Sequence, residues 1–309
     1  LITLLYIGII IYGFNSMSHT TIPSNEKITA LVKLDGVIGS NLEVNADDVI
    51  NGLREAYAHQ GTEAIILSIN SPGGSPVQAG IINDEINRYK LLHPNIPIYA
   101  VVEDVCASGG YYIAAAADSI FASPNTITGS IGVFGLVPYV GDFMKNKLGI
   151  TVDRVTTGPY ADIMSLSRRM RPDERALIQE GVNQVYQDFV SVVSKGRGLS
   201  PDSVHSLAQG RVYTGRQALA LGLVDRMGGL NDAVACAARM AKLSSYRLRE
   251  LPEAKDPFEE FIGQLSGAYA DYQSRSEWGP LYRPYQHVRP WIQNRGIQAR
   301  LEFVPQPLP

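Results

Sequence analysis

Short apolar runs alternate with amphipathic segments through the middle of the chain. The runs are rich in Ile, Val and Ala, as buried strands are, and they lie at residues 28–38, 64–70, 98–104 and 119–124. The amphipathic segments predict helices at residues 46–59, 77–92, 108–117, 171–197, 201–209 and 231–243. This repeated alternation predicts an α/β fold in which crossover helices pack on a parallel or mixed sheet.

The composition divides the chain into three predicted parts. Residues 1–14 carry no charge and lead into a polar run, so residues 1–26 are predicted to be a membrane anchor and linker. A cleaved signal peptide and a buried segment are the alternatives, because this apolar stretch is shorter than the roughly 20 residues that cross a bilayer. Residues 27–251 contain no internal boundary and are predicted to fold as one domain.

Residues 252–309 form the third part, a carboxy-terminal extension rich in Pro, aromatic and Arg residues. We expect an extended tail that packs on its own domain or on a neighbouring subunit. A second interpretation is that its arginines contact anionic lipid headgroups. These arginines are Arg283, Arg289, Arg295 and Arg300.

The charge and the cysteine content exclude several classes of protein. Lysine and arginine number 27 against 30 aspartates and glutamates, which gives a formal net charge of −3. This balance argues against nucleic acid as a partner, since phosphate binding needs clustered positive charge. The two cysteines, Cys106 and Cys236, cannot build a disulfide framework, and no Cys/His spacing indicates a metal site.

Three turns rich in glycine and serine carry the candidate chemistry. NSPGGS at residues 70–75 has paired glycines that let a ligand backbone approach closely. VCASGGYY at residues 105–112 places Ser108 at a strand-to-helix turn, where free helix amides stabilise negative charge. TITGSIGV at residues 126–133 is the third. Taken singly, they are consistent with a plain turn, a helix N-cap at Ser108 and a further Gly-rich turn.

The three motifs in this order resemble the serine–lysine peptidases of the signal peptide peptidase A family, over about residues 27–251. The resemblance implies a Clp/crotonase-like fold of stacked ββα units. It also implies that Ser108 is the nucleophile and that Gly73 and Gly109 supply the oxyanion hole. Ser130 would help to orient the general base. The chemistry of this family needs no metal or organic cofactor.

Ala161 occupies the position expected for the general-base lysine of that family. Single-domain members carry the lysine in a Gly-x-x-Lys stretch, whereas residues 158–161 read GPYA. The stretch resembles instead the serine-bearing carboxyl-terminal half of the two-half peptidases, in which the other half supplies the lysine. The chain therefore lacks its lysine half, receives a lysine from a partner chain, or is inactive as a hydrolase. Lys145 and Lys147 are the nearest substitutes, although lysines are usually solvated.

The resemblance implies a membrane-anchored serine endopeptidase that degrades cleaved signal peptides or small membrane-associated peptides in extended form. It also implies self-association and a place in the bacterial inner membrane, with the peptidase domain outside the cytoplasm. The alternative is a catalytically silent subunit of the same fold that binds hydrophobic peptides or acts as a scaffold. An acyl-CoA enzyme of the crotonase type is disfavoured by the serine of the ASGG turn and by the amino-terminal apolar segment.

Overall fold

The computed structural model describes residues 26–242, 247–252 and 296–300. The predicted anchor at residues 1–26 therefore lies almost entirely outside the described residues, as does most of the extension at residues 252–309. Among the helices of the described part, none is long and apolar enough to cross a bilayer.

A mostly parallel sheet forms the centre of the domain. Its main path runs in the order β10-β1-β2-β4-β5-β9, and every neighbouring pair on this path is parallel. These strands are β1 (Ile28–Asp35), β2 (Thr62–Ser71), β4 (Ile98–Ala107), β5 (Ser119–Ala122), β9 (Arg226–Met227) and β10 (Arg247–Leu251). β6 (Ile127–Gly129) pairs in parallel with the end of β4 and antiparallel with β8 (Val212–Thr214). The carboxyl end of β4 is therefore held between β2 and β6.

Side chains of the central strands alternate between two cores, as the period of two in a strand requires. On β2, Ile65 and Leu67 join the larger core, while Ile66 joins the smaller one. The larger core includes side chains of α2 (Ala46–Ala58), α3 (Pro76–Leu92) and α4 (Gly109–Ala114), and also of α6 (Pro172–Arg197), α7 (Pro201–Leu207) and α8 (Gly215–Ala220). On the opposite face, α9 (Leu230–Met240) packs against the smaller core. Because both faces are buried, the strands read as nearly continuous apolar runs.

Several helices begin where the sequence supplies a cap or a proline. Asn45 accepts a hydrogen bond from the amide of Asp48 at 3.0 Å and begins α2, and Ser75 caps α3 in the same way. α6 (Pro172–Arg197) begins with a proline and ends at Gly198, whose φ of 64° is typical of a helix end. The remaining helix of the described part, α5, spans Gly141–Leu148.

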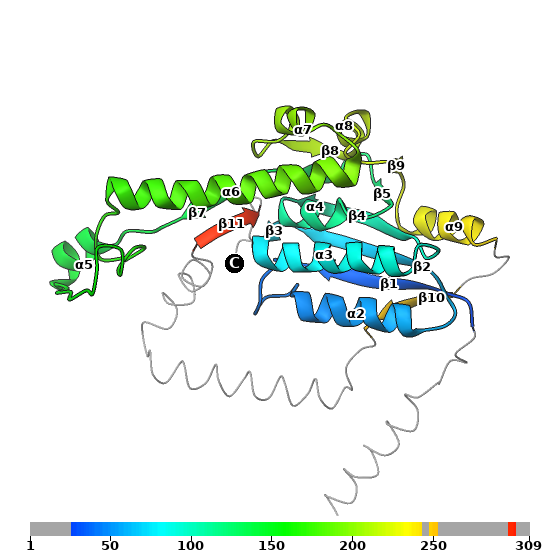
Figure 1. The fold of residues 1–309 in the computed structure, drawn as a ribbon, viewed down its shortest axis with the longest axis horizontal. Helices are drawn as coiled ribbons and strands as arrows, with labels where there is room; N and C mark the ends of the chain where they lie inside the picture. The colour runs from blue at the N-terminus through cyan, green and yellow to red at the C-terminus, as the bar shows by residue number, and fades with distance from the viewer. Residues whose placement is uncertain (1–25, 243–246, 253–295, 301–309) are drawn as a thin grey trace, which may run out of the picture.

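α6 extends past the sheet, and α5 lies at its amino end (Figure 1). α5 has no buried residue. Exposed apolar side chains gather in it and in the segment that follows: Phe143, Leu148, Ile150, Val152 and Val155. We call α5 and residues 149–171 the arm. Its apolar surface is of the kind that marks interaction sites on soluble proteins.

A three-stranded sheet lies at the carboxyl edge of the main sheet, directly after β2. Its order is β3-β11-β7, and both pairs are antiparallel. The strands are β3 (Gly73–Gly74), β7 (Phe134–Leu136) and β11 (Gly296–Arg300). β11, red in Figure 1, belongs to the carboxy-terminal extension and pairs with two strands of the domain.

The predicted α/β fold with a mostly parallel sheet is confirmed, and each predicted helix and strand overlaps an observed one. The helix predicted at residues 108–117 is shorter than expected, because α4 ends at Ala114 and turns follow it. β6, β7, β8 and β9 were not predicted, since two or three residues are too few to show a strand period.

Phe189 on α6 is fully buried, and its ring lies 5.0 Å from that of Tyr112 on α4. We expect Phe189→Ala to lower the free energy of unfolding by about 3–5 kcal/mol, because it leaves a cavity in the core. Leu177→Ala on the same helix is the control, since that side chain is 51% exposed and its loss should cost at most about 0.5 kcal/mol. Urea denaturation followed by circular dichroism measures both, and equal losses would contradict the prediction.

Candidate active site

The three motif turns meet at one edge of the main sheet. β2, β4 and β6 are neighbouring parallel strands, and one of the turns follows each of them. The register pairs Ser71 with Cys106 and Ala107 with Gly129. Because the carboxyl ends of adjacent parallel strands lie side by side, the residues after them are brought together, and ligands of α/β sheets bind at this edge.

Ser108 connects β4 to α4 through a strained turn. Its φ of 54° and ψ of −117° lie in a region that residues with a side chain rarely adopt. Ser108 is fully buried, its amide donates to the carbonyl of Gly129 at 2.9 Å, and its hydroxyl donates to the carbonyl of Gly132 at 3.4 Å. The side chain makes no capping hydrogen bond to α4. The hydroxyl therefore sits at a helix start without serving as its cap.

Contacts on two sides fix the position of α4. Tyr111 is fully buried, and its hydroxyl donates to the carbonyl of Leu223 at 2.7 Å. Gly110 lies so close to β2 that a Cβ there would come within 3.0 Å of the carbonyl oxygen of Ser71. The second glycine of the ASGG motif is thus a packing requirement that sets α4 against the SPGG turn.

The two predicted oxyanion donors belong to the turns that meet at this edge. The amide of Gly109 is the first of α4, where an amide has no intrahelical acceptor. The amide of Gly73, whose φ is 97°, donates to the hydroxyl of Ser71 at 3.2 Å. That hydroxyl donates in turn to the carbonyl of Gly36 at 2.6 Å. The oxyanion role of Gly73 and Gly109 stays a prediction, and Ser71 is a polar neighbour that was not predicted.

Ser130 follows β6 as Ser108 follows β4. Since Ala107 and Gly129 are register partners, the two serines occupy equivalent positions on adjacent strands. Ser130 is buried with a φ of 48°, and its amide donates to the carbonyl of Arg211 at 2.8 Å. Its hydroxyl makes no hydrogen bond to any residue that the structure describes. The predicted role of Ser130 beside a general base stays a prediction.

Ala161 lies in an exposed turn of the arm, which Figure 1 shows at the far end of α6 and well away from α4. Lys145 and Lys147 are exposed on α5, at the same end of the molecule. The fold therefore brings none of these three residues to Ser108 of the same chain.

An ion-pair cluster fixes the turn that carries Ala161. Arg168 donates to Asp162 at 2.7 Å and also pairs with Glu174, a buried carboxylate in the first turn of α6. Arg154 makes a second ion pair with Asp162. Hydrogen bonds from Arg168, and then from Arg154, hold the pKa of Asp162 well below its usual value of 3.8. The turn therefore has a defined conformation although it is exposed.

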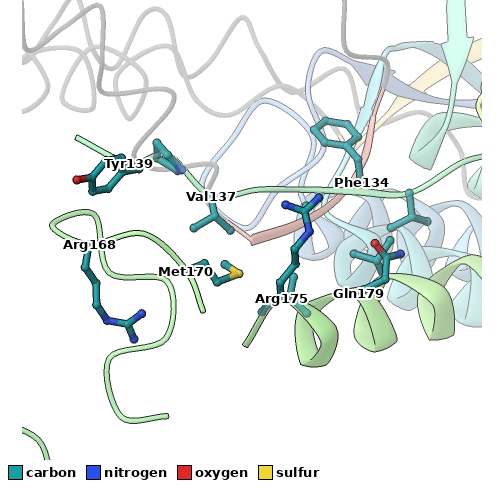
Figure 2. A pocket seen from close by; sticks show the side chains of 12 residues that line it. Phe134, Val137, Tyr139, Arg168, Met170, Arg175 and Gln179 are labelled. Carbon is teal, nitrogen blue, oxygen red and sulfur yellow. The ribbon is translucent and has the colours of Figure 1, made fainter. Parts of the chain in front are cut away.

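A cavity of about 420 Å³ lies between β7 and the first half of α6. Figure 2 shows Phe134 on β7 across from Arg175 and Gln179 on α6. Most of the other side chains around the cavity are apolar: Val133, Val137, Pro138, Met170, Ile178 and Val182. Since β7 forms one wall and pairs with β11, the cavity borders the three-stranded sheet.

The structure offers little support for other chemistry near Ser108. Among the described residues, no three His, Cys, Asp or Glu side chains form a group that could hold a metal ion. Cys106 and Cys236 are both buried free thiols. Burial raises the pKa of Cys106, so its thiolate is not formed at neutral pH. The nucleophilic role of Ser108 stays a prediction.

A buried serine on a strained strand-to-helix turn, beside the first amide of a helix and a glycine turn, is an arrangement typical of serine hydrolases. The chain belongs to peptidase family S49, whose sequence pattern matches residues 90–244. The predicted family and the predicted enzyme class, a serine peptidase, are therefore confirmed.

Three relatives show how much of the chain is shared. A protein of Enterococcus faecium named as a signal peptide peptidase SppA is 38% identical over 255 residues, which are 78% of this chain and 72% of that protein. A Synechocystis protein named as a protease is 34% identical over 82% of this chain and 88% of its own length. Protease 4 of Salmonella typhi is 37% identical over 73% of this chain, but the match spans only 36% of Protease 4.

Asp162→Asn should lower the free energy of unfolding at neutral pH, because it removes a carboxylate that Arg168 and Arg154 stabilise in the folded state. A lowered pKa in the folded state contributes stability above the pKa of the unfolded chain, so the difference should be complete above about pH 5 and shrink as the pH falls. Denaturation at pH 7, 5 and 3.5 measures it. The exposed Asp84→Asn is the control, and a loss that stays constant down to pH 3.5 would contradict the prediction.

Proposed function

We propose that this chain is the serine-bearing subunit of a membrane-anchored endopeptidase that degrades cleaved signal peptides or small membrane-associated peptides. We propose also that its general-base lysine comes from another half or chain. The conformation of Ser108 carries the proposal, because a buried serine with a φ of 54° costs about 1–3 kcal/mol, and such strain concentrates at functional sites.

The proposed reaction begins when a neutral lysine takes the proton of the Ser108 hydroxyl. The hydroxyl oxygen attacks the peptide carbonyl, and the amides of Gly73 and Gly109 stabilise the resulting oxyanion. The lysine then gives its proton to the leaving amine, and water hydrolyses the acyl-enzyme. A lysine can act in this way only where burial lowers its pKa toward neutrality.

An extended peptide suits this site because β3 and β7 present strand edges on either side of a slot. Main-chain hydrogen bonds to two edges would hold a peptide of almost any sequence. The cavity beside β7 combines apolar side chains such as Phe134 and Ile178 with the polar Arg175 and Gln179, so it can receive an apolar side chain beside polar groups. The name of the Enterococcus faecium relative supports signal peptides as the substrate class.

The arm supports self-association or docking of a lysine-supplying partner. Its apolar side chains are exposed, and Val155 is completely so. Contact through this surface would bury the apolar area and would bring the ordered turn at Ala161 next to another chain. Protease 4, of which this chain matches about a third, is a relative long enough to hold a second half.

We place the protein at the bacterial inner membrane with the peptidase domain outside the cytoplasm. The uncharged apolar segment at residues 1–14 supports an anchor, and these residues lie outside the described part of the chain. A membrane location would bring the slot between β3 and β7 close to cleaved signal peptides.

A catalytically silent peptide-binding subunit is the second candidate. The observation that favours it is Ala161, which has no ionisable group, together with the exposed positions of Lys145 and Lys147 on α5. Such a subunit would still bind peptides in the slot between β3 and β7 but would not hydrolyse them.

A fluorophosphonate probe tests the nucleophile directly. We expect the probe to label the full chain in detergent, alone or after addition of native cell extract. We expect Ser108→Ala to abolish labelling, because Ser108 stands at the start of a helix whose free amides can stabilise the negative charge of the adduct. Heat-denatured protein is the control. Labelling of the chain alone would place the base within its own oligomer, labelling only with extract would indicate a partner lysine, and no labelling in either case would favour the silent subunit.

Ala161→Lys tests the origin of the base. If neighbouring copies place residue 161 beside Ser108, this substitution should raise the labelling rate by roughly 10²–10⁴-fold, the usual effect of a positioned general base. Ala161→Met, which has similar length and no amine, is the control. Equal rates for the wild type and Ala161→Lys, with clear labelling of both, would contradict the prediction and make Lys145 and Lys147 the next residues to substitute.

A further inference from the structure

β11 occupies the slot that an extended peptide would need. Its residues Ala299 and Arg300 lie opposite Gly74 and Gly73 of β3. Its residues 296–298 lie opposite residues 136–134 of β7. One segment of the carboxy-terminal extension therefore pairs with both edges of the slot at once.

The strand edges of β3 and β7 that face β11 have few other hydrogen-bonding partners in the described part of the chain. The opposite side of β3 is already bonded to Ile38, whose amide donates to the carbonyl of Gly73 at 3.0 Å and whose carbonyl accepts from the amide of Ser75 at 2.8 Å. In the described part of the chain, β7 pairs with no strand except β11. An unpaired edge recruits an extended chain, so β11 and a peptide substrate compete for the same hydrogen-bonding groups.

β11 ends beside residues of the predicted active site. The strand runs from Gly296 beside β7 to Arg300 beside Gly73, one of the predicted oxyanion donors. β11 also contacts α4, the helix that begins after Ser108. Ser108 itself is fully buried. A substrate strand that pairs with β3 and β7 would have to take the place of β11.

We propose that residues 296–300 are an internal ligand of the peptide groove, which excludes substrates by occupying the slot between β3 and β7. This proposal rests on the proposed function, because it assigns the slot to peptides. The recognition is by backbone: two antiparallel edges bind an extended strand, and attachment to the same chain gives that strand an effective concentration on the order of mM.

A pair of proline substitutions in the full chain tests the proposal. Adjacent amides of a strand point to opposite edges, so Gln298→Pro/Ala299→Pro removes one donor toward each neighbour. Gln298→Ser/Ala299→Ser keeps both amides and is the matched control. All three proteins carry Ser108→Ala, so that no peptide is cleaved during the measurements.

Hydrogen exchange of the amides of residues 134–136 is the first readout. We expect slow exchange in the parent and in the serine control, and exchange faster by roughly tenfold or more in the proline variant, because strand hydrogen bonds are lost. The second readout is fluorescence polarisation with a labelled peptide of residues 294–304. We expect it to bind the proline variant roughly tenfold or more tightly than the parent, since no tethered strand competes.

Equal hydrogen exchange in all three proteins, or equal peptide binding by the parent and the proline variant, would contradict the proposal that residues 296–300 are an internal ligand. Neither readout requires hydrolysis. If the expected differences appear while Ser108 never reacts with fluorophosphonate, the peptidase function fails and the internal ligand stands. If Ser108 is labelled and the differences are absent, the internal ligand fails and the peptidase function stands.

Discussion

The parallel register of β2, β4 and β6 is the constraint on which the site depends. Because Ala107 is paired with Gly129, the chain must turn within one residue to begin α4, and Ser108 takes up the strain. That strain costs about 1–3 kcal/mol, while each backbone hydrogen bond contributes about 1 kcal/mol. The amide and carbonyl of Ser108 bond to Gly129 and Tyr112, at 2.9 and 2.8 Å, so the sheet and the helix together offset much of the cost.

Prediction from sequence succeeds where a signal is local. The strands and helices of the two cores were predicted because burial on both faces leaves apolar runs and because residues such as Asn45 and Ser75 mark helix starts. The position of Ser108 followed from its motif. β11 was not predicted, since its partners are distant in sequence and a backbone pairing leaves no side-chain pattern. The bond between Gly73 and Ser71 depends on the fold of the turn and has no sequence signal.

α6 separates position 161 from Ser108 within one chain. Its 26 residues span about 39 Å, and the ordered turn at Ala161 lies at its amino end. α4 packs near the other end, where Phe189 meets Tyr112 and Gly196 lies against Ala115. A lysine stem has four carbons and cannot bridge such a separation. The fold thus keeps residue 161 away from Ser108 of the same chain.

A groove built from backbone edges carries little sequence selectivity of its own. Gly73 and Gly74 offer no side chains, so β3 accepts any extended segment, including one from its own chain. Selection among peptide substrates must then come from the cavity beside β7 and from competition between β11 and the substrate for the slot. In the proposed function, the base comes from another half or chain and the competing strand comes from the same chain, so the two act on Ser108 independently. Hydrolysis would then require two events, assembly with the lysine-bearing partner and displacement of β11. Such control suits an enzyme whose slot would otherwise accept any unfolded protein.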